Sequence, residues 1–125
     1  MGRVLVVDDD ETIRALLEAH LKQIGHRVLL TGSAEEAIAA VDHHGAPDIA
    51  VLDVRLPDIH GFELAEELRA ATGLEKLPII FLSANVDQVH IDRGREIGAV
   101  YLTKPYIRAA LRNAIDKALA EHQGW

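Results

Sequence analysis

Cysteine is absent from this chain of 125 residues, and aromatic residues make up only 4% of it. Without cysteine, neither a disulfide framework nor a thiolate metal site is available, which excludes thiol redox chemistry and suits a reducing cytoplasm. The sequence also contains no run of about 18 apolar residues, the length that a membrane-spanning helix requires. No membrane span and no secretion signal are therefore predicted, and a cytoplasmic location is expected.

Positive charge is scarce as well. The chain has 13 Lys and Arg residues against 20 Asp and Glu residues, with a formal net charge of -7. Direct binding to nucleic acid depends largely on basic side chains that neutralise phosphates, and no basic cluster offsets this acidic balance. Partners that are proteins or cations are expected instead.

A length of 125 residues fits one domain, spanning positions 1–125, and the hydrophobic fraction of 49% is that of a globular protein. Five short apolar runs are rich in Val, Ile and Leu and are predicted to form buried strands. These runs cover residues 4–7, 28–30, 49–52, 79–82 and 100–102.

Patterns with helical spacing separate the apolar runs. One apolar stripe contains Ile13, Leu16 and Leu17, and another extends from Ile107 to Leu119. A capping box of Ser33 and Glu36 should open the second helix, the third should start near Gly61, and the fourth should cover about 86–97. Strict alternation of strand and helix predicts an α/β fold: a doubly wound (βα)5 three-layer sandwich with a parallel five-stranded sheet.

Polar residues follow four of the five predicted strands. In doubly wound sheets the ligand crevice lies outside the carboxyl ends of the strands, so these residues should converge there. Asp10 is expected only to cap a helix, and the second strand ends in Thr31-Gly32, which offers no comparable group. The converging residues are Asp8 and Asp9, Asp53, Ser83, and Thr103 with Lys104.

The carboxylates of Asp8, Asp9 and Asp53 need a cation between them. At about 4 Å and an effective dielectric constant near 20, two such charges repel by about 4 kcal/mol. Hard oxygen ligands without nearby His or Cys favour Mg²⁺, with Mn²⁺ as an alternative. An aspartate beside a metal, with Lys104 and the Ser83 hydroxyl opposite, is suited to attack a phosphoryl group, and Asp53 is the predicted nucleophile.

These motifs together resemble the response-regulator receiver family of two-component signalling, in the manner of single-domain chemotaxis regulators. The motifs are Val6-Val7-Asp8-Asp9, Asp53 followed by Leu56-Pro57 and Gly61, Ser83-Ala84, and Tyr101-Leu102-Thr103-Lys104-Pro105. The resemblance implies a flavodoxin-like strand order 2-1-3-4-5. It also implies that Asp53 receives a phosphoryl group from a histidine kinase or a histidine phosphotransfer protein.

The resemblance further implies roles for individual site residues. Mg²⁺ would be held by Asp9, Asp53 and the backbone carbonyl of Arg55, with Asp8 acting through water. Ser83 and Tyr101 would be the switch residues, and Lys104 would pair with the phosphoryl oxygens. The Lys104-Pro105 peptide would be cis, and the positions of Arg55 and Asn85 would tune the rate of dephosphorylation.

The resemblance also implies an output surface made by the fourth helix, the fifth strand and the fifth helix. Phosphorylation would shift this surface toward a downstream protein or domain, and dimerisation on activation stays open. The domain would be a phosphoacceptor that assists its own phosphorylation and dephosphorylation, not an enzyme.

Two alternatives remain open at the level of sequence. The stretch from Asp8 to Thr12 also fits the Asp-x-Asp-x-Thr signature of haloacid-dehalogenase-like phosphatases, in which Asp8 would be the nucleophile. That family has a further acidic pair after a later strand, and Ser83-Ala84-Asn85 supplies none. The second alternative is a pseudo-receiver that binds partners without being phosphorylated, which a missing site residue would favour; none is missing.

Overall fold

The structure, a computed structural model, describes residues 2–84 and 88–122. Five strands and five helices alternate along the chain, which confirms the predicted order. They are β1 (Arg3–Val7), α1 (Glu11–Gln23), β2 (Arg27–Thr31), α2 (Ala34–His44), β3 (Ile49–Asp53), α3 (Gly61–Thr72), β4 (Ile79–Ser83), α4 (Gln88–Glu96), β5 (Val100–Thr103) and α5 (Arg108–His122).

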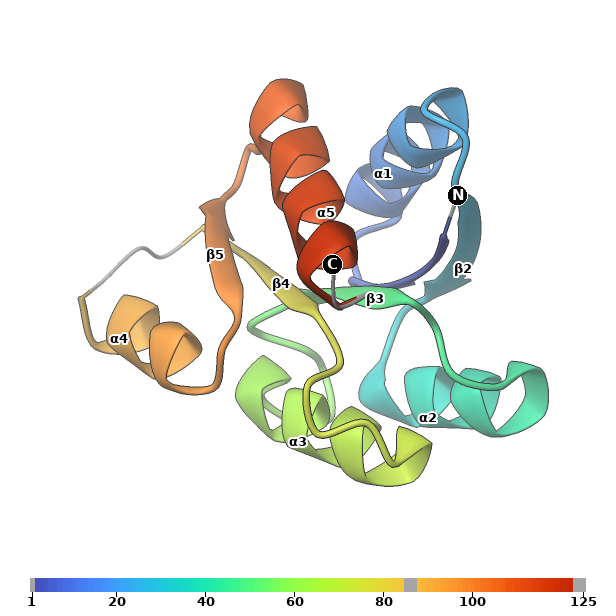
Figure 1. Cartoon of the computed structure of the whole chain (residues 1–125), viewed down its shortest axis with the longest axis vertical. Coiled ribbons are helices and arrows are strands. Elements are labelled where there is room, and N and C mark those ends of the chain that lie inside the picture. The colour runs from blue at the N-terminus through green and yellow to red at the C-terminus, as the bar shows by residue number, and fades with distance from the viewer. Residues whose placement is uncertain (1, 85–87, 123–125) are drawn as a thin grey trace.

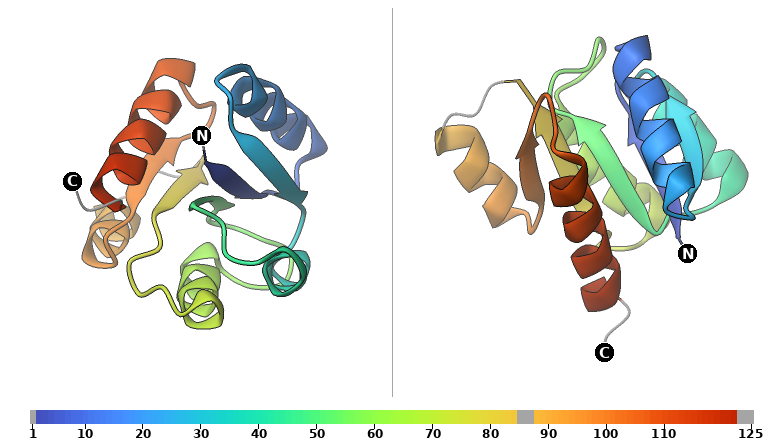
Figure 2. Two further views of the ribbon diagram at one scale, coloured as in Figure 1. Left: turned by 45° about the vertical axis from the view of Figure 1, so that its right-hand side comes forward. Right: turned by 90° about the horizontal axis from the view of Figure 1, so that it is seen from above.

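The strands form one parallel sheet in the order β2-β1-β3-β4-β5. Helices α1 and α5 cover one face of the sheet, and α2, α3 and α4 lie on the other side (Figure 1). The additional views in Figure 2 show the same sheet between two helical layers. The flavodoxin-like doubly wound sandwich with strand order 2-1-3-4-5 is therefore confirmed.

The core consists of two apolar clusters, one on each face of the sheet. On one face, Leu17 and Leu21 of α1 and Ile115 of α5 pack against alternate residues of the central strands. On the other face, side chains of α2 and α3 such as Val41 and Phe62 do the same. Strands β3 and β4 are buried along their whole length, because helices cover both of their faces and strands flank both of their edges.

The prediction that all five strands are buried is wrong for β2 and β5. Both lie at the edges of the sheet, where one flank has no neighbouring strand, and they bury fewer side chains. Leu30 is 36% exposed and Val100 is 39% exposed. An apolar run of three or four residues therefore marks a strand, but it does not by itself distinguish a central strand from an edge strand.

The helices also differ in detail from their predicted stripes. Leu16 on α1 is 44% exposed, and Ile107, which is 71% exposed, precedes α5. The described part of the fourth helix, Gln88–Glu96, is shorter than the predicted 86–97. Residues 85–87, which include the start of that prediction, lie outside the described residues.

Each of the first three helices begins at a residue whose side chain accepts a backbone hydrogen bond. Asp10 accepts from the amides of Thr12 and Ile13, which confirms its expected role as a cap. Ser33 accepts from the Glu36 amide at 3.2 Å, while the Glu36 carboxylate accepts from the amide of Gly32. The predicted capping box is thus present, but its glutamate reaches one residue further back than expected.

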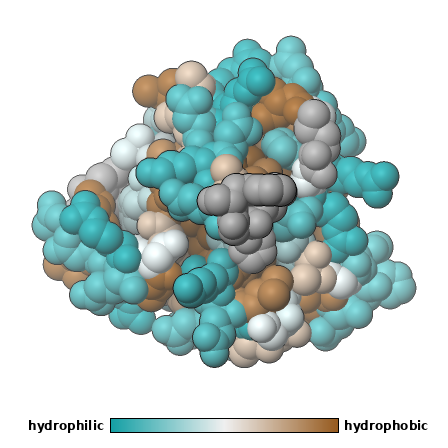
Figure 3. All heavy atoms as spheres, viewed as in Figure 1, coloured by the Kyte–Doolittle hydropathy of each residue, from teal (hydrophilic) through white to brown (hydrophobic). Residues whose placement is uncertain are grey.

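Hydrophilic side chains dominate the face of the molecule in Figure 3, with hydrophobic ones visible in separate areas. Within the described residues, no helix combines the length and the apolar character needed to cross a membrane.

Candidate functional site

Four predicted site residues meet at the carboxyl edge of the sheet. Asp8 follows β1, Asp53 ends β3, Ser83 ends β4 and Lys104 follows β5. Because neighbouring parallel strands end at the same edge, residues far apart in sequence become adjacent. A cavity of about 310 Å³ lies here, lined by Asp53, Arg55, Ser83, Ala84 and Lys104.

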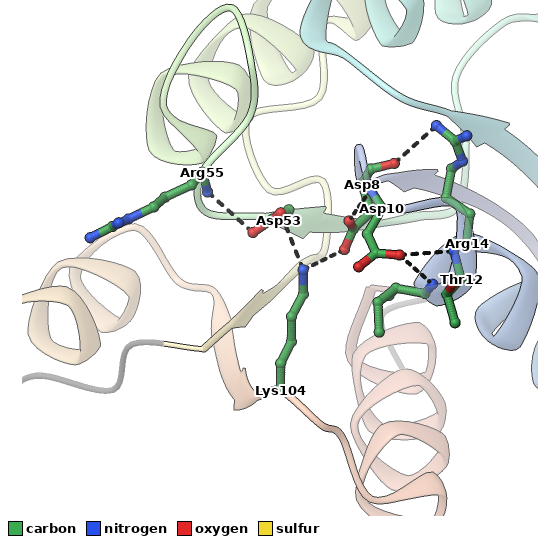
Figure 4. Close-up of polar contacts among 8 residues, drawn as sticks. Asp8, Asp10, Thr12, Arg14, Asp53, Arg55 and Lys104 are labelled. Carbon is green, nitrogen blue, oxygen red and sulfur yellow. Dashed lines mark hydrogen bonds and ion pairs between the residues drawn. The ribbon is translucent and has the colours of Figure 1, made fainter.

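Lys104 bridges two carboxylates at this edge (Figure 4). Its Nζ lies 2.7 Å from Oδ2 of Asp8 and 3.2 Å from Oδ2 of Asp53. Burial by itself lowers the pKa of Lys104, but the two carboxylates outweigh that effect and raise the pKa above its usual value. Lys104 is therefore a permanently charged partner for both aspartates at neutral pH.

The surroundings of Asp53 disfavour the charged form of its carboxylate. Burial, reinforced by the nearby charge of Asp8, raises the pKa of Asp53 despite the opposing effects of Lys104 and of a hydrogen bond from the Arg55 amide. The charged form of Asp53 is thus held in an environment that solvates it less well than water does. An additional cation at this site would stabilise that charge.

The acidic residues fit a divalent cation. One carboxylate oxygen from each of Asp8, Asp9 and Asp53 lies within 4.8 Å of the other two. Oδ2 of Asp8 is buried and accepts no hydrogen bond of good geometry among the described residues, so its close cationic neighbour is the ammonium group of Lys104. Clustered carboxylate oxygens are the hard donor set that Mg²⁺ and Mn²⁺ prefer.

The remaining predicted site residues are placed as follows. Arg55 is exposed beside the cavity, and the Lys104–Pro105 peptide is cis, the conformation that the resemblance implies. Tyr101 on β5 is partly buried, and its ring centroid lies 6.3 Å from that of Phe81 on β4. Asn85 lies outside the described residues.

A contact that sequence reasoning missed joins the loop after Asp53 to α2. Both carboxylate oxygens of Asp58 accept hydrogen bonds from the first amides of α2, at 3.0 Å from Ala34 and 2.9 Å from Glu35. These amides lack partners within the helix, so Asp58 caps α2 from a distance of 24 residues along the chain. The loop that carries the site is thereby tied to a neighbouring helix.

We expect Asp58→Asn to remove an acid-sensitive contribution to stability. The amides of Ala34 and Glu35 hold the pKa of Asp58 below its ordinary value of 3.8. A carboxylate of this kind stabilises the folded state above its unfolded pKa, and the contribution is lost as the pH falls through the lowered value. Urea unfolding should therefore give a difference between wild type and variant that is constant near neutral pH and shrinks below about pH 4.

Asp42→Asn provides the matched control, because it makes the same charge change in an exposed residue near the other end of α2. A loss of stability at neutral pH as large as that of Asp58→Asn would contradict the proposed cap.

Gly61, at the first position of α3, packs directly against the strand that carries Asp53. Its amide donates to the carbonyl of Val54 at 2.6 Å. A Cβ atom at Gly61 would lie 2.5 Å from the carbonyl oxygen of Asp53 and 2.9 Å from Cα of Val54. The start of α3 can approach Asp53 this closely only because residue 61 has no side chain.

Comparisons with known proteins identify the family of this chain. Residues 4–116 match the family model described as response regulator receiver domain. The transcriptional regulatory protein AfsQ1 of Streptomyces coelicolor is 39% identical over 121 residues, which are 90% of this chain and 52% of that protein. AruR of Pseudomonas aeruginosa, also a transcriptional regulatory protein, is 42% identical over 108 residues, which are 82% of this chain and 43% of that protein. The chain thus spans about half the length of the curated relatives it matches.

Solved structures of similar length also match. A CheY-like response regulator receiver domain protein from Methanospirillum hungatei superimposes with a TM-score of 0.87 and 26% identity, covering 98% of this chain and 97% of that one. The BeF3-activated DrrB receiver domain gives a TM-score of 0.81 and 30% identity, covering 96% of this chain and 98% of that one. These similarities favour the receiver family over the dehalogenase-like phosphatase alternative.

Proposed function

Because this chain belongs to the response regulator receiver family, whose members accept phosphoryl groups in two-component signalling, we propose that Asp53 is its phosphoacceptor. One observation carries the assignment. Of the three clustered carboxylates, that of Asp53 lines the cavity of about 310 Å³, together with Ser83 and Lys104. Asp8, the acceptor in the phosphatase alternative, is 2% exposed and paired with Lys104.

In the proposed reaction a carboxylate oxygen of Asp53 attacks the phosphorus atom of the donor. The new O–P bond forms while the bond from phosphorus to the donor breaks, and the leaving group keeps the electron pair of that bond. With a phosphohistidine donor the leaving group is the imidazole ring, which gains a proton; with acetyl phosphate it is acetate. The product is an aspartyl phosphate, and no oxidant or reductant takes part.

Residues around Asp53 supply the electrostatic part of catalysis. Lys104 lies close enough to Asp53 to form an ion pair with the phosphoryl oxygens after Asp53 has been phosphorylated. The Ser83 hydroxyl lines the same cavity and would donate a hydrogen bond to them. Mg²⁺, held by Asp9, Asp53 and the carbonyl of Arg55 with Asp8 acting through water, would neutralise phosphoryl charge when bound.

We also propose that Ser83 and Tyr101 couple this chemistry to the surface made by α4, β5 and α5. Tyr101 neighbours Phe81, which lies two residues before Ser83 on β4, so movement at Ser83 has a short packed route to β5. Gly94 of α4 faces the same rings. In this proposal the donor is a histidine kinase or a histidine phosphotransfer protein, and the switched surface binds a downstream output protein or domain. The chain acts in the cytoplasm as a phosphoacceptor, without enzymatic turnover. Arg55 and Asn85 would set the lifetime of the aspartyl phosphate.

Chemical trapping tests the assignment. The chain is incubated with acetyl phosphate and Mg²⁺, reduced with borohydride and digested, which converts a phosphorylated aspartate into homoserine at its position. We expect the modification in the peptide that contains Asp53, and only when Mg²⁺ is present. Homoserine at Asp8 would overturn the proposal in favour of the phosphatase-like alternative, and no modification at any aspartate would favour a pseudo-receiver.

A further inference from the structure

Asp8 is held by its backbone as well as by its side chain. The Asp8 amide donates to the carbonyl of Thr31 at the end of β2, at 3.1 Å. The Asp8 carbonyl accepts from Nη1 of Arg14, at 3.2 Å, and its Oδ1 accepts from the amide of Asp10 at 2.9 Å. Arg14 lies on the second turn of α1, so its guanidinium reaches back across the whole β1–α1 turn (Figure 4).

The Arg14 contact fixes the peptide unit that joins Asp8 to Asp9. Because a peptide unit is planar, holding the carbonyl oxygen of Asp8 also fixes the direction of the Asp9 amide and the point from which the Asp9 side chain departs. Asp9 is exposed, and among residues 2–84 and 88–122 its carboxylate has no hydrogen bond or ion pair. Its position relative to Asp8 and Asp53 therefore depends on the backbone.

Gly32 provides the space that the guanidinium of Arg14 occupies. A Cβ atom at position 32 would overlap Nη1 of Arg14. Gly32 is buried, and it is not among the glycines with positive φ, so a side chain is excluded by space and not by backbone conformation. Because the overlapping atom is the end of a flexible side chain, the fold can accommodate alanine at position 32 if the Arg14 guanidinium moves away.

Charge supports the same arrangement. Arg14 and Lys104 approach Asp8 from different sides, Arg14 at the carbonyl and Lys104 at the carboxylate (Figure 4). The Glu11 carboxylate, which pairs with Arg14 in the part of the chain that the structure describes, is 91% exposed and 3.9 Å away, so it holds the guanidinium only weakly. The direction of Arg14 is therefore set by the Asp8 carbonyl and by the space above Gly32.

We infer that Arg14 is a positioning residue for the acidic metal ligands, and that Gly32 is required because it leaves room for the Arg14 guanidinium. This inference rests on the proposed function, in which Asp8 and Asp9 help to hold Mg²⁺. In this inference Arg14 acts through the backbone of Asp8 and would contact neither the metal nor the phosphoryl group. It sets the orientation of the peptide unit that joins Asp8 to Asp9, and the side chains of both residues depart from that unit.

The test measures Mg²⁺ binding by titration calorimetry for wild type, Arg14→Met, Gly32→Ala and the double variant. Residues that orient metal ligands typically contribute about 10-fold to 100-fold in affinity, and we expect each single variant to bind Mg²⁺ about 10-fold more weakly. The double variant should be no weaker than either single variant, because both changes remove the same contact. Arg14→Lys, which keeps a cation and one donor, should restore part of the affinity.

Kinetics separate positioning from a general structural defect. In labelling with acetyl phosphate, the Mg²⁺ concentration for the half-maximal rate should rise by the same factor of about 10, while the rate at saturating Mg²⁺ stays within about 2-fold of wild type. Urea unfolding without metal checks that the fold is intact. The matched control for Arg14→Met is Arg112→Met, at an exposed arginine of α5. The matched control for Gly32→Ala is Gly94→Ala, where a Cβ would meet side chains at 3.5 Å or more.

Wild-type Mg²⁺ affinity in Gly32→Ala, or effects of the two changes that multiply in the double variant, would overturn the inference. Asp9→Asn distinguishes this failure from a failure of the proposed function. If Asp9→Asn binds Mg²⁺ as wild type does, the metal site itself is wrong. If Asp9→Asn loses affinity while the Arg14 and Gly32 variants keep it, only the positioning role is overturned.

Discussion

Asp53→Asn is expected to abolish incorporation of a phosphoryl group from acetyl phosphate, whereas Asp8→Asn should only slow it. The amide of asparagine has almost the same shape as the carboxylate but is not a nucleophile, so no aspartyl phosphate can form. Asp8→Asn keeps the acceptor and weakens the neighbouring cation site, for which a loss of about 10-fold to 100-fold is typical. Intact-protein mass spectrometry after a fixed incubation with Mg²⁺ measures both. Retained labelling of the Asp53→Asn chain would refute the assignment.

The stability of Asp53→Asn gives a second readout, which also shows whether this variant has folded. Burial raises the pKa of Asp53, so its charged form costs folding free energy, and this cost is present above the raised pKa and disappears as the pH falls through it. Without metal at neutral pH, Asp53→Asn should therefore be more stable than wild type in urea unfolding. The stability gain should diminish in acid, where wild-type Asp53 is itself protonated. A destabilised Asp53→Asn chain would indicate that the ion pair with Lys104 outweighs the cost of burial.

Gly61→Ala should produce the largest loss of stability from a single methyl group. The new Cβ would lie 2.5 Å from the carbonyl oxygen of Asp53 and 2.9 Å from Cα of Val54, both of which are backbone atoms in or next to β3. Backbone cannot rotate away as a side chain can, so the start of α3 or the end of β3 must move. Overpacking of this kind typically costs about 1–3 kcal/mol and sometimes more. Urea unfolding of the metal-free chain measures the change.

Gly94→Ala is the matched control for this substitution. A Cβ at Gly94 would meet the Tyr101 and Phe81 rings at 3.5 and 3.9 Å, which is ordinary van der Waals contact. Alanine is favoured over glycine in a helix interior by roughly 0.5–1 kcal/mol, so this variant should be slightly more stable than wild type. Equal effects of alanine at the two positions would contradict the backbone overlap at Gly61.

The sequence predicted the architecture and the edge at which the site lies, for identifiable reasons. Apolar runs too short for helices identified the strands, and alternation with helical stripes required a parallel sheet whose strand ends meet. Residues directly after a strand, such as Asp53 and Lys104, could therefore be placed together without coordinates. The edge positions of β2 and β5 could not be predicted from the residues alone, because an apolar run of three or four residues looks alike in both settings.

The supporting contacts could not be predicted, because they depend on how elements pack and not on where a strand ends. In the sequence, Asp58 has no feature that distinguishes it from other loop residues. Its partner amides lie 24 and 23 positions earlier in the chain, at the start of another helix. Thr31-Gly32 offered no group comparable to the aspartates or the lysine at the ends of the other strands. What matters at Gly32 is the space that it leaves for Arg14, and a pattern of side chains contains no record of such space.

Lys104 bridges Asp8 and Asp53, so its ammonium group serves as a counterion for both carboxylates. Any cation that enters has to compete with an ammonium group already in contact with two carboxylates. A monovalent ion brings no more charge than the lysine it would displace, so it gains little by the exchange. A small divalent ion brings twice that charge, so under the proposed function we expect the site to take up a divalent cation in preference to a monovalent one.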